Sequence, residues 1–248
     1  MSTTALELVT SDGITLRGRR WVPTATARAT VVLVHGFAAS SSEDKVVDLA
    51  TQLCDAGFGV VAVDSRGHGA SGGQATLGDA ERHDVAAAVA AARSAAEPIV
   101  LVGASMGAIG VLRHLAERGA DATPVLGAVT VSCPARWKLP RNARGLLSAV
   151  MTYTPVGRWG TRRYLHIDIA KPAARPAPPS DLVPQIHVPL VLIHGRADPF
   201  IPVGDAELLH DVANDPKRLQ VVDAMGHAFE PPSIGPVLAA VDWLLARP

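Results

Sequence analysis

The stretch Ile99-Val100-Leu101-Val102-Gly103-Ala104-Ser105-Met106-Gly107 decides the fold, because it reads as a buried strand, a sharp turn and the start of a helix. Its first four residues are all apolar, as a strand buried on both faces requires. The pattern G-x-S-x-G then places Ser105 between two glycines, just after that strand. Such a turn exposes the serine hydroxyl at a helix N-terminus, where developing negative charge is favoured. The sequence therefore predicts a nucleophilic serine at the edge of a parallel sheet.

The alternation of strand and helix patterns extends outward from this stretch. It predicts βαβ units, and hence an α/β fold with a mostly parallel twisted sheet and helices on both faces. The chain begins with alternating apolar and polar residues around Ser11-Asp12-Gly13, a pattern typical of an antiparallel hairpin. The predicted buried strands are residues 30–34, 60–63, 99–102, 126–131, 190–193 and 219–222. The predicted helices are residues 43–56, 79–95, 106–118 and 238–245.

A long interruption divides this pattern. Residues 134–186 break the alternation for roughly fifty residues, which is too long for an ordinary connection. We therefore expect an α/β core built from residues 1–133 and 187–248, with residues 134–186 inserted as a short helical lid (cap). Prolines concentrate at residues 171–184, which predicts an extended and fairly stiff return arm.

The predicted lid is rich in aromatic and basic side chains. Aromatic residues form only 4% of the chain. Four of them fall in the lid and are expected to line a substrate pocket, namely Trp137, Tyr153, Trp159 and Tyr164. Between Pro134 and Ser180 there are nine Lys and Arg residues and one acid, Asp168. This charge pattern fits a solvated basic face, an anionic substrate or docking on an acidic surface.

Composition excludes several classes of protein. Of the 248 residues, 48% are apolar and 19% are charged, which indicates a globular chain with a large core. A formal net charge of zero gives no reason to expect a nucleic-acid partner. The N-terminus lacks the features of a secretory signal, and no run approaches the roughly 18 apolar residues of a transmembrane segment. We therefore expect a cytoplasmic protein. We also expect no disulfide framework, because two cysteines, Cys54 and Cys133, are too few for one in a chain of this size.

A serine hydroxyl needs a base, which should lie on a later loop at the same edge of the sheet. His227 fits this requirement, because it follows the predicted strand at 219–222 and precedes the last helix. His35 and His194 also end predicted strands near that edge, so both are alternatives.

The imidazole in turn needs a carboxylate that fixes its tautomer. Asp198 follows the predicted strand at 190–193, and the order Ser105, Asp198, His227 matches the chain order of such triads on α/β sheets. All three lie after strands, at the edge where open α/β sheets place their sites. Asp223 also ends a strand and is the rival acid. We predict a catalytic triad of Ser105, His227 and Asp198.

Two backbone N–H groups should stabilise the oxyanion that forms when serine attacks a carbonyl. The N–H of Met106, directly after the serine, is one candidate. The other is the N–H of Phe37, in the loop after the first buried strand. Gly36 precedes Phe37 and lets the backbone of this loop approach closely.

Five segments together resemble the α/β-hydrolase superfamily, and the resemblance covers nearly the whole chain. They are the oxyanion loop at 35–37, the turn at 64–69, the nucleophile elbow at 103–107, the acid loop at 194–202 and the histidine loop at 226–227. The set is most similar to the branch with a short helical lid, which includes monoacylglycerol lipases, carboxylesterases and some serine peptidases. The resemblance implies a serine hydrolase that cleaves a small carboxylic ester through an acyl-enzyme intermediate and uses no cofactor. It also implies that Arg66 and His68 are structural turn residues.

Other functions remain open. The same triad could also carry out thioester hydrolysis, amide or peptide hydrolysis, or acyl transfer. A further alternative is a catalytically silent binding protein, which would fail to react with a serine-reactive phosphonate probe. Gly103, Gly107 and Gly110, with Asp121 further on, also fit the turn of a dinucleotide-binding oxidoreductase, which would bind NAD. That turn, however, should follow the first parallel strand rather than an inner one. The metal patterns CxxC and HExxH do not occur.

Overall fold

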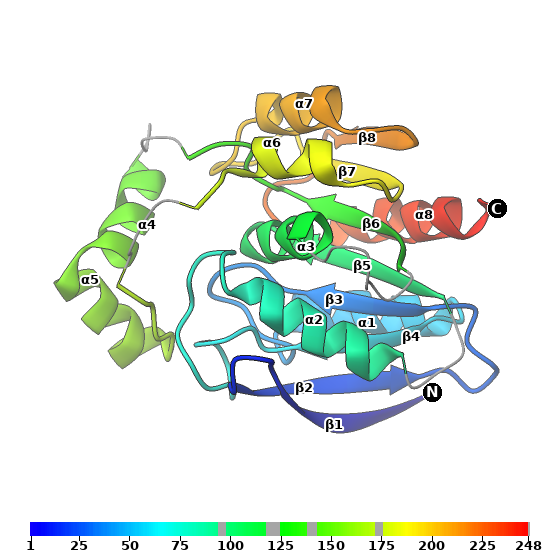
Figure 1. The fold of residues 1–248 in the computed structure, drawn as a ribbon, viewed down its shortest axis with the longest axis horizontal. Helices are drawn as coiled ribbons and strands as arrows, with labels where there is room; N and C mark the ends of the chain where they lie inside the picture. The colour runs from blue at the N-terminus through cyan, green and yellow to red at the C-terminus, as the bar shows by residue number, and fades with distance from the viewer. Residues whose placement is uncertain (94–97, 118–124, 138–142, 172–175, 248) are drawn as a thin grey trace.

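One twisted sheet of eight strands organises the molecule, in the order β1-β2-β4-β3-β5-β6-β7-β8 (Figure 1). The computed structural model describes residues 1–93, 98–117, 125–137, 143–171 and 176–247. The strands are β1 Ser2–Val9, β2 Thr15–Val22, β3 Thr30–Val34, β4 Gly59–Val63, β5 Ile99–Ala104, β6 Val125–Val131, β7 Leu190–Gly195 and β8 Lys217–Val222. The pairs β1–β2 and β2–β4 are antiparallel, whereas β3 to β8 pair in parallel. The predicted fold class, with its N-terminal antiparallel hairpin, is confirmed.

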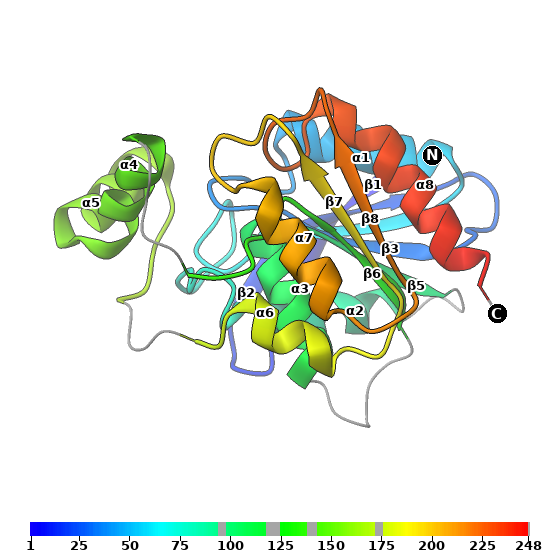
Figure 2. The same cartoon turned by 90° about the horizontal axis from the view of Figure 1, so that it is seen from above.

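Helices cover both faces of this sheet (Figures 1 and 2). The α-helices are α1 Asp44–Asp55, α2 Glu81–Ala92, α3 Met106–Glu117, α4 Ala143–Tyr153, α5 Pro155–Gly160, α6 Pro179–Leu182, α7 Val203–Val212 and α8 Ile234–Leu245. Short helical segments of other types are the π-helix η1 Thr161–Leu165 and the 3₁₀ turns η2 Val183–Gln185 and η3 Pro231–Ser233. The last helix begins at Ile234, not at residue 238 as predicted, because Pro236 is tolerated in the first turn. Within the described ranges, no helix is long and apolar enough to cross a membrane.

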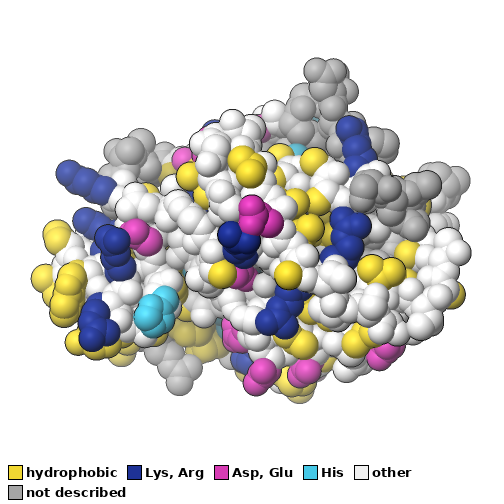
Figure 3. All heavy atoms as spheres, turned by 90° about the horizontal axis from the view of Figure 1, so that it is seen from below, with side chains coloured by type: hydrophobic (Ala, Val, Ile, Leu, Met, Phe, Trp, Pro, Cys, Tyr) yellow, Lys and Arg dark blue, Asp and Glu magenta, His cyan; other side chains and the backbone are white. Residues whose placement is uncertain are grey.

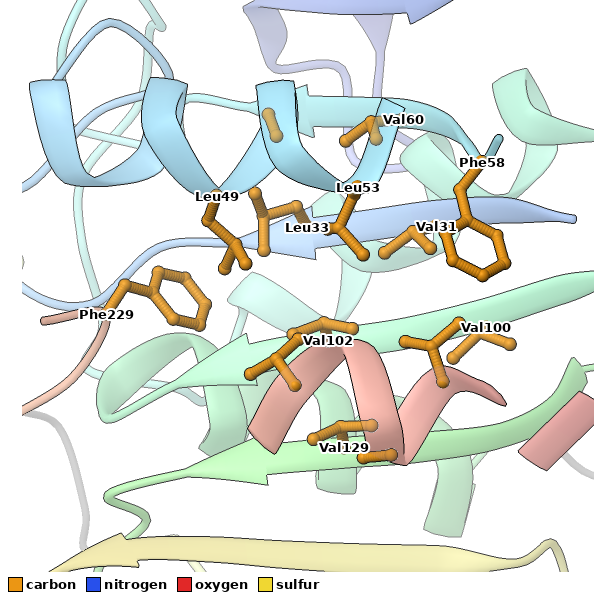
Figure 4. Packing of buried hydrophobic residues seen from close by; sticks show 14 of the residues in the cluster. Val31, Leu33, Leu49, Leu53, Phe58, Val60, Val100, Val102, Val129 and Phe229 are labelled. Atoms are coloured by element: carbon orange, nitrogen blue, oxygen red, sulfur yellow. The ribbon is translucent and has the colours of Figure 1, made fainter. Parts of the chain in front are cut away.

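The continuous apolar runs of the sequence become strands buried on both faces. Every residue of β3, β4 and β5 is buried. Alternate residues of β3 point to opposite sides, so that Val31 and Leu33 meet Leu49 and Leu53 of α1 (Figure 4). Val32 belongs to the second cluster, on the other face, with side chains of α2 and α3. Each fully buried Val or Leu contributes about 1.5–3 kcal/mol to folding, so these two layers fix the position of the strand ends.

The order of the strands creates a switch point beside β3. From β3 the chain moves outward to β4 and then returns to the other side of β3 as β5. Loops that leave the carboxyl ends of β3 and β5 therefore diverge, and open α/β sheets bind ligands in the crevice at this point. Gly36 follows β3 and Ser105 follows β5, so both lie at this edge.

The segment predicted as a lid has two parts. Residues 143–165, here called the lid lobe, form α4, α5 and η1, which stand apart from the sheet beyond its carboxyl edge (Figures 1 and 2). By contrast, Ala135, Val183 and Ile186 belong to the second hydrophobic cluster of the core, and Leu182 is buried as well. The extended arm predicted from the prolines is wrong for residues 179–184. Pro179 starts α6, because a proline at the first helical position loses no hydrogen bond.

Some residues of the sequence predictions cannot be placed. Lys138, Arg141 and Arg175 of the basic segment, Asp121 of the dinucleotide alternative and Arg118 at a predicted helix end lie outside the described residues.

Candidate active site

Ser105 occupies a strained turn between β5 and α3. Its φ of 49° lies in the left-handed region, which costs a non-glycine residue about 1 kcal/mol or more. Two hydrogen bonds hold this conformation: the N–H of Ser105 donates to the carbonyl of Val131 at 2.9 Å, and its carbonyl accepts from Ile109 N–H at 3.2 Å. The turn leaves the serine half-buried at the carboxyl edge of the sheet. The conformation expected from the G-x-S-x-G pattern is therefore present.

Close backbone packing explains the glycines around this turn. A Cβ on Gly107 would overlap the carbonyl oxygens of Val34 and His35, because α3 begins directly against the end of β3. A Cβ on Gly36 would lie 3.3 Å from the Cβ of Ser105. The loop after β3 thus passes immediately beside the serine. A side chain at position 107 would overlap the backbone of β3, and one at position 36 would crowd Ser105.

Phe37 follows Gly36, which approaches Ser105, and Met106 follows Ser105 directly. Among the described residues, neither Phe37 N–H nor Met106 N–H donates a hydrogen bond to the protein. Met106 is the first residue of α3, whose N-terminal N–H groups carry partial positive charge. An oxyanion site requires two unpaired N–H donors beside the nucleophile, and that role for Phe37 and Met106 remains a prediction.

Asp198 and His227 meet through a short hydrogen bond. Nδ1 of His227 donates to Oδ2 of Asp198 at 2.7 Å, which fixes the proton on Nδ1 and leaves Nε2 as an acceptor. The other carboxylate oxygen, Oδ1, accepts the N–H groups of Phe200 and Ile201, each at 2.9 Å. The carboxylate is fully buried, whereas the imidazole side chain remains 21% exposed. The carboxylate of Asp198 is therefore held by three hydrogen bonds, and the imidazole of His227 remains partly accessible to solvent.

The environment of Asp198 keeps it ionised. Burial alone would raise the pKa of this carboxyl. The hydrogen bond and charge of His227, together with the N–H groups of Ile201 and Phe200, outweigh burial and lower the pKa below its usual value. An ionised Asp198 stabilises a positively charged imidazole on His227.

Contacts between two loops hold Asp198 and His227 side by side. The N–H of Ala197 donates to the carbonyl of Met225 at 3.1 Å, which joins the acid loop to the histidine loop. The N–H of Gly226, directly before His227, donates to Oε2 of Glu230 at 2.8 Å. A Cβ on Gly195 would overlap the carbonyl oxygens of Met225 and Gly226, so the two loops are in direct contact.

The alternative histidines are engaged in the scaffold. His35 is buried; its Nδ1 donates to Gly36 O at 2.7 Å, and its Nε2 accepts Ser65 N–H at 2.9 Å. Burial, with the nearby His68, lowers the pKa of His35 to about 4, so its ring is neutral at pH 7. Nε2 of His194 donates to the carbonyl of Ile201 at 3.0 Å, and its side chain is also buried. Both rings lack the exposure that a base at the edge requires.

The rival acid faces solvent. The side chain of Asp223 is 83% exposed, and its carboxylate accepts Nε of Arg196 at 2.6 Å. By contrast, Asp198 is buried against His227. The structure thus favours Asp198 as the partner of the imidazole.

The turn at residues 64–69 supports the loop that carries Phe37. The guanidinium of Arg66 is buried and binds the carboxylates of Asp84 and Asp12 at 2.7–3.0 Å. The ring of His68 packs edge-on against the rings of His35 and Phe37, with centroids 5.3 and 5.6 Å apart. Both residues therefore have structural contacts, as the resemblance implied.

Sequence reasoning missed three residues that contact the site. Ser132, buried at the end of β6, accepts Ala228 N–H on its Oγ at 3.1 Å, next to His227. The ring of Phe200 lies against the imidazole of His227 at a centroid distance of 5.0 Å. Glu230 accepts the N–H of Gly226. The position of Ser132 one residue beyond the strand next to β5 could have indicated its proximity, whereas the other two depend on loop conformation.

The four aromatic residues proposed for a substrate wall are distributed over two regions. Nε1 of Trp137 donates to the carbonyl of Pro176 at 2.7 Å, and its ring packs beside the core. Tyr153, Trp159 and Tyr164 are exposed side chains of the lid lobe. Trp159 and Tyr164 contact each other edge-on, with ring centroids 6.0 Å apart. A pocket formed by all four remains a prediction.

Metal binding has no support from clustered ligands. Within the described residues, no group of three or more His, Cys, Asp or Glu side chains gathers in a way that could hold a metal ion. Cys54 and Cys133 are both free and buried.

Comparison with known proteins gives a consistent match. The sequence profile of a family described as serine aminopeptidase, S33, matches residues 25–165. An uncharacterized protein of Bacillus subtilis, YqkD, is 25% identical over 244 residues, which cover 92% of this chain and 74% of YqkD. The esterase Pf2001 of Pyrococcus furiosus superposes with a TM-score of 0.75 at 25% identity, over 98% of this chain and 90% of the esterase. The esterase EaEST of Exiguobacterium antarcticum superposes with a TM-score of 0.72 at 18% identity, over 98% and 100% of the two chains.

Proposed function

The chain belongs to the serine aminopeptidase S33 family and is a serine hydrolase of the α/β-hydrolase superfamily. We propose that it hydrolyses a carboxylic ester through Ser105, His227 and Asp198. The single observation that carries this proposal is the hydrogen bond of 2.7 Å between His227 Nδ1 and the buried Asp198. It leaves Nε2 of a partly exposed imidazole free to accept a proton at the edge where Ser105 lies.

The first half-reaction acylates the serine. Nε2 of His227 accepts the proton of Ser105 Oγ as this oxygen attacks the ester carbonyl carbon. The tetrahedral oxyanion accepts hydrogen bonds from the N–H groups of Phe37 and Met106. The imidazolium is stabilised by the ionised carboxylate of Asp198. When the C–O bond to the alcohol breaks, His227 returns the proton to the departing alkoxide.

The second half-reaction releases the acid. A water molecule transfers a proton to Nε2 of His227 and attacks the acyl carbon. The same two N–H groups stabilise the second oxyanion. The bond between Ser105 Oγ and the acyl carbon breaks, and Oγ regains the proton from His227. The products are a carboxylic acid and the regenerated hydroxyl.

The choice of a carboxylic ester rests on the solved relatives. Pf2001 and EaEST are esterases, and the first matches almost the whole chain at 25% identity. The name of the matched family, serine aminopeptidase, favours a second candidate, in which the same groups cleave an amide or peptide bond. Thioester hydrolysis and acyl transfer follow from the same acyl-enzyme chemistry. We also propose that the enzyme acts in the cytoplasm on a small-molecule acyl substrate.

A substrate panel tests this proposal. The panel contains p-nitrophenyl esters of graded acyl length, matched acyl thioesters, and aminoacyl p-nitroanilides. We expect kcat/KM for at least one ester to exceed the values for the thioester and the anilide of similar size. Higher kcat/KM for the anilides would favour the peptidase candidate. No turnover of any of the three classes, by protein that is folded, would overturn the proposed function.

A further inference from the structure

The large apolar side chains exposed to solvent concentrate in the lid lobe. Twelve such side chains occur in the described chain, and eight of them lie within residues 146–165. They are Leu146, Leu147, Val150, Tyr153, Val156, Trp159, Tyr164 and Leu165. Val156 and Trp159 are 76% and 62% exposed. Single exposed apolar residues are ordinary on a soluble protein, but such a concentration marks a surface that contacts a partner.

The arrangement of these side chains is that of an amphipathic element without a core to cover. Leu146, Val150 and Tyr153 lie four and three residues apart on α4, so they share one face of that helix. In a globular protein this face would pack against the body of the molecule. Here α4 packs against α5, and α5 against η1, at the outer end of the molecule. Figure 3 shows hydrophobic side chains gathered at the outer end of this lobe, with Lys and Arg side chains beside them.

The charge of the lobe distinguishes between its candidate partners. Between residues 143 and 171 the basic residues are Arg144, Arg158, Arg162, Arg163 and Lys171, and Asp168 is the one acid. The side chain of Arg162 is 74% exposed, and that of Arg163 is also exposed. A second copy of this chain would bring arginines against arginines, which is unfavourable. A partner that complements the lobe must offer an apolar region for its apolar side chains and anionic groups for its arginines. An anionic lipid bilayer has both, because its acyl chains are apolar and its headgroups carry phosphates.

We propose that the lid lobe is a docking surface for anionic lipid bilayers. The apolar side chains of α4, α5 and η1 enter the boundary between headgroups and acyl chains. Arg162 and Arg163 remain at the level of the headgroup phosphates and bind them. Because the lobe lies beyond the carboxyl edge of the sheet, docking turns the edge that carries Ser105 toward the bilayer (Figure 1). The docking itself does not depend on which bond the enzyme cleaves.

Vesicle sedimentation tests this docking directly. The full chain is incubated with vesicles of phosphatidylcholine alone and with vesicles of phosphatidylcholine and phosphatidylglycerol in equal parts. At about 10 mM salt we expect at least tenfold stronger binding to the anionic vesicles. This preference should decline toward about 1 M salt, where the Debye length falls from about 30 Å to about 3 Å. The fluorescence of the exposed Trp159 should shift to the blue when anionic vesicles are added.

Matched variants separate the lobe from the rest of the surface. Val156→Asp should lower binding to anionic vesicles at least tenfold. Val9→Asp is the matched control, because it makes the same change at a side chain that is 65% exposed on β1, and it should leave binding unchanged. Arg163→Glu should lower binding severalfold, whereas Arg93→Glu, at the end of α2, makes the same change in net charge and should not. Val156→Asp should leave turnover of a short soluble ester unchanged, which shows that the variant is folded.

Two results would overturn the proposal. One is equal binding, or none, to both kinds of vesicle by the folded protein. The other is a dimer without vesicles, detected by light scattering, that Val156→Asp dissociates; the lobe would then be an interface between two copies. Failure of ester turnover with intact vesicle binding would reject the proposed reaction but leave the docking surface in place.

Discussion

Replacement of Asp198 by asparagine should remove most of the activity without unfolding the protein. In the native loop, Oδ1 of Asp198 accepts two N–H groups, from Phe200 and Ile201, while Oδ2 accepts Nδ1 of His227. An asparagine keeps its single oxygen toward the two N–H groups, since turning the amide over would sacrifice two hydrogen bonds worth about 1 kcal/mol each. Its NH₂ group then faces His227. The imidazole must accept on Nδ1 and carry its proton on Nε2, where it can no longer take a proton from serine.

The expected magnitude follows from this change of tautomer. Loss of tautomer control in a serine, histidine and aspartate triad lowers kcat by about 10⁴, or about 5 kcal/mol of transition-state stabilisation. KM should change little, because Asp198 is fully buried and does not face the substrate. Initial rates with the best p-nitrophenyl ester, with thermal unfolding as a control for folding, measure both effects. Asp223→Asn is the matched control, because it neutralises an exposed acid bound to Arg196, and it should change kcat less than threefold.

Two results would contradict this role of Asp198: an Asp198→Asn variant that retains more than a tenth of the native kcat, or a larger loss of kcat in Asp223→Asn than in Asp198→Asn. The first result would mean that the hydrogen bond of 2.7 Å does not set the tautomer of His227. The second would move the acid to the exposed loop.

Two further predictions concern the scaffold of the site. Ser132→Ala removes the acceptor of Ala228 N–H beside His227 and should lower the free energy of unfolding by about 1–3 kcal/mol. We also expect a larger relative decrease in kcat than increase in KM. Unchanged kinetics would show that this hydrogen bond does not position His227. His35 has its pKa lowered to about 4 by burial, so the folded protein binds fewer protons than the unfolded chain between pH 6.5 and about 4. The free energy of unfolding in urea should therefore fall by about 3 kcal/mol as the pH drops through this range, and a slope unaltered in His35→Gln would contradict this assignment.

The sequence carries most of the information about the sheet because its signals are local. Continuous apolar runs such as 31–34 are typical of strands buried on both faces, and Gly103 is required by contacts with Gly107 and Ala108 in the same turn. The sequence favoured His227 by its place before the last helix but left His35 and His194 as alternatives, since each of the three comes after a predicted strand. Their difference lies in burial and in the partners of their ring nitrogens, which depend on loops far apart in the chain.

The lid segment shows the opposite case. Its composition distinguishes residues 134–186 from the rest of the chain, but composition does not say which part packs on the core. Leu182 and Val183 are buried through a helical turn that begins at Pro179, a position at which proline is compatible with a helix start. The lid lobe instead leaves its apolar side chains exposed to solvent. The hydrophobic periodicity of a helix predicts that such side chains pack against the core, so the sequence pattern alone does not predict their exposure.

Chemical labelling can identify the nucleophile of this enzyme. The protein is treated with a fluorophosphonate that reacts with activated serines, and the modified residue is located by peptide mass spectrometry. We expect one adduct, on the peptide that contains Ser105, and no adduct in Ser105→Ala. The kcat of this variant for an ester should fall by about 10⁴–10⁶ with folding intact. An adduct on a different residue, or a folded Ser105→Ala variant that retains a tenth of the activity, would contradict this assignment of the nucleophile.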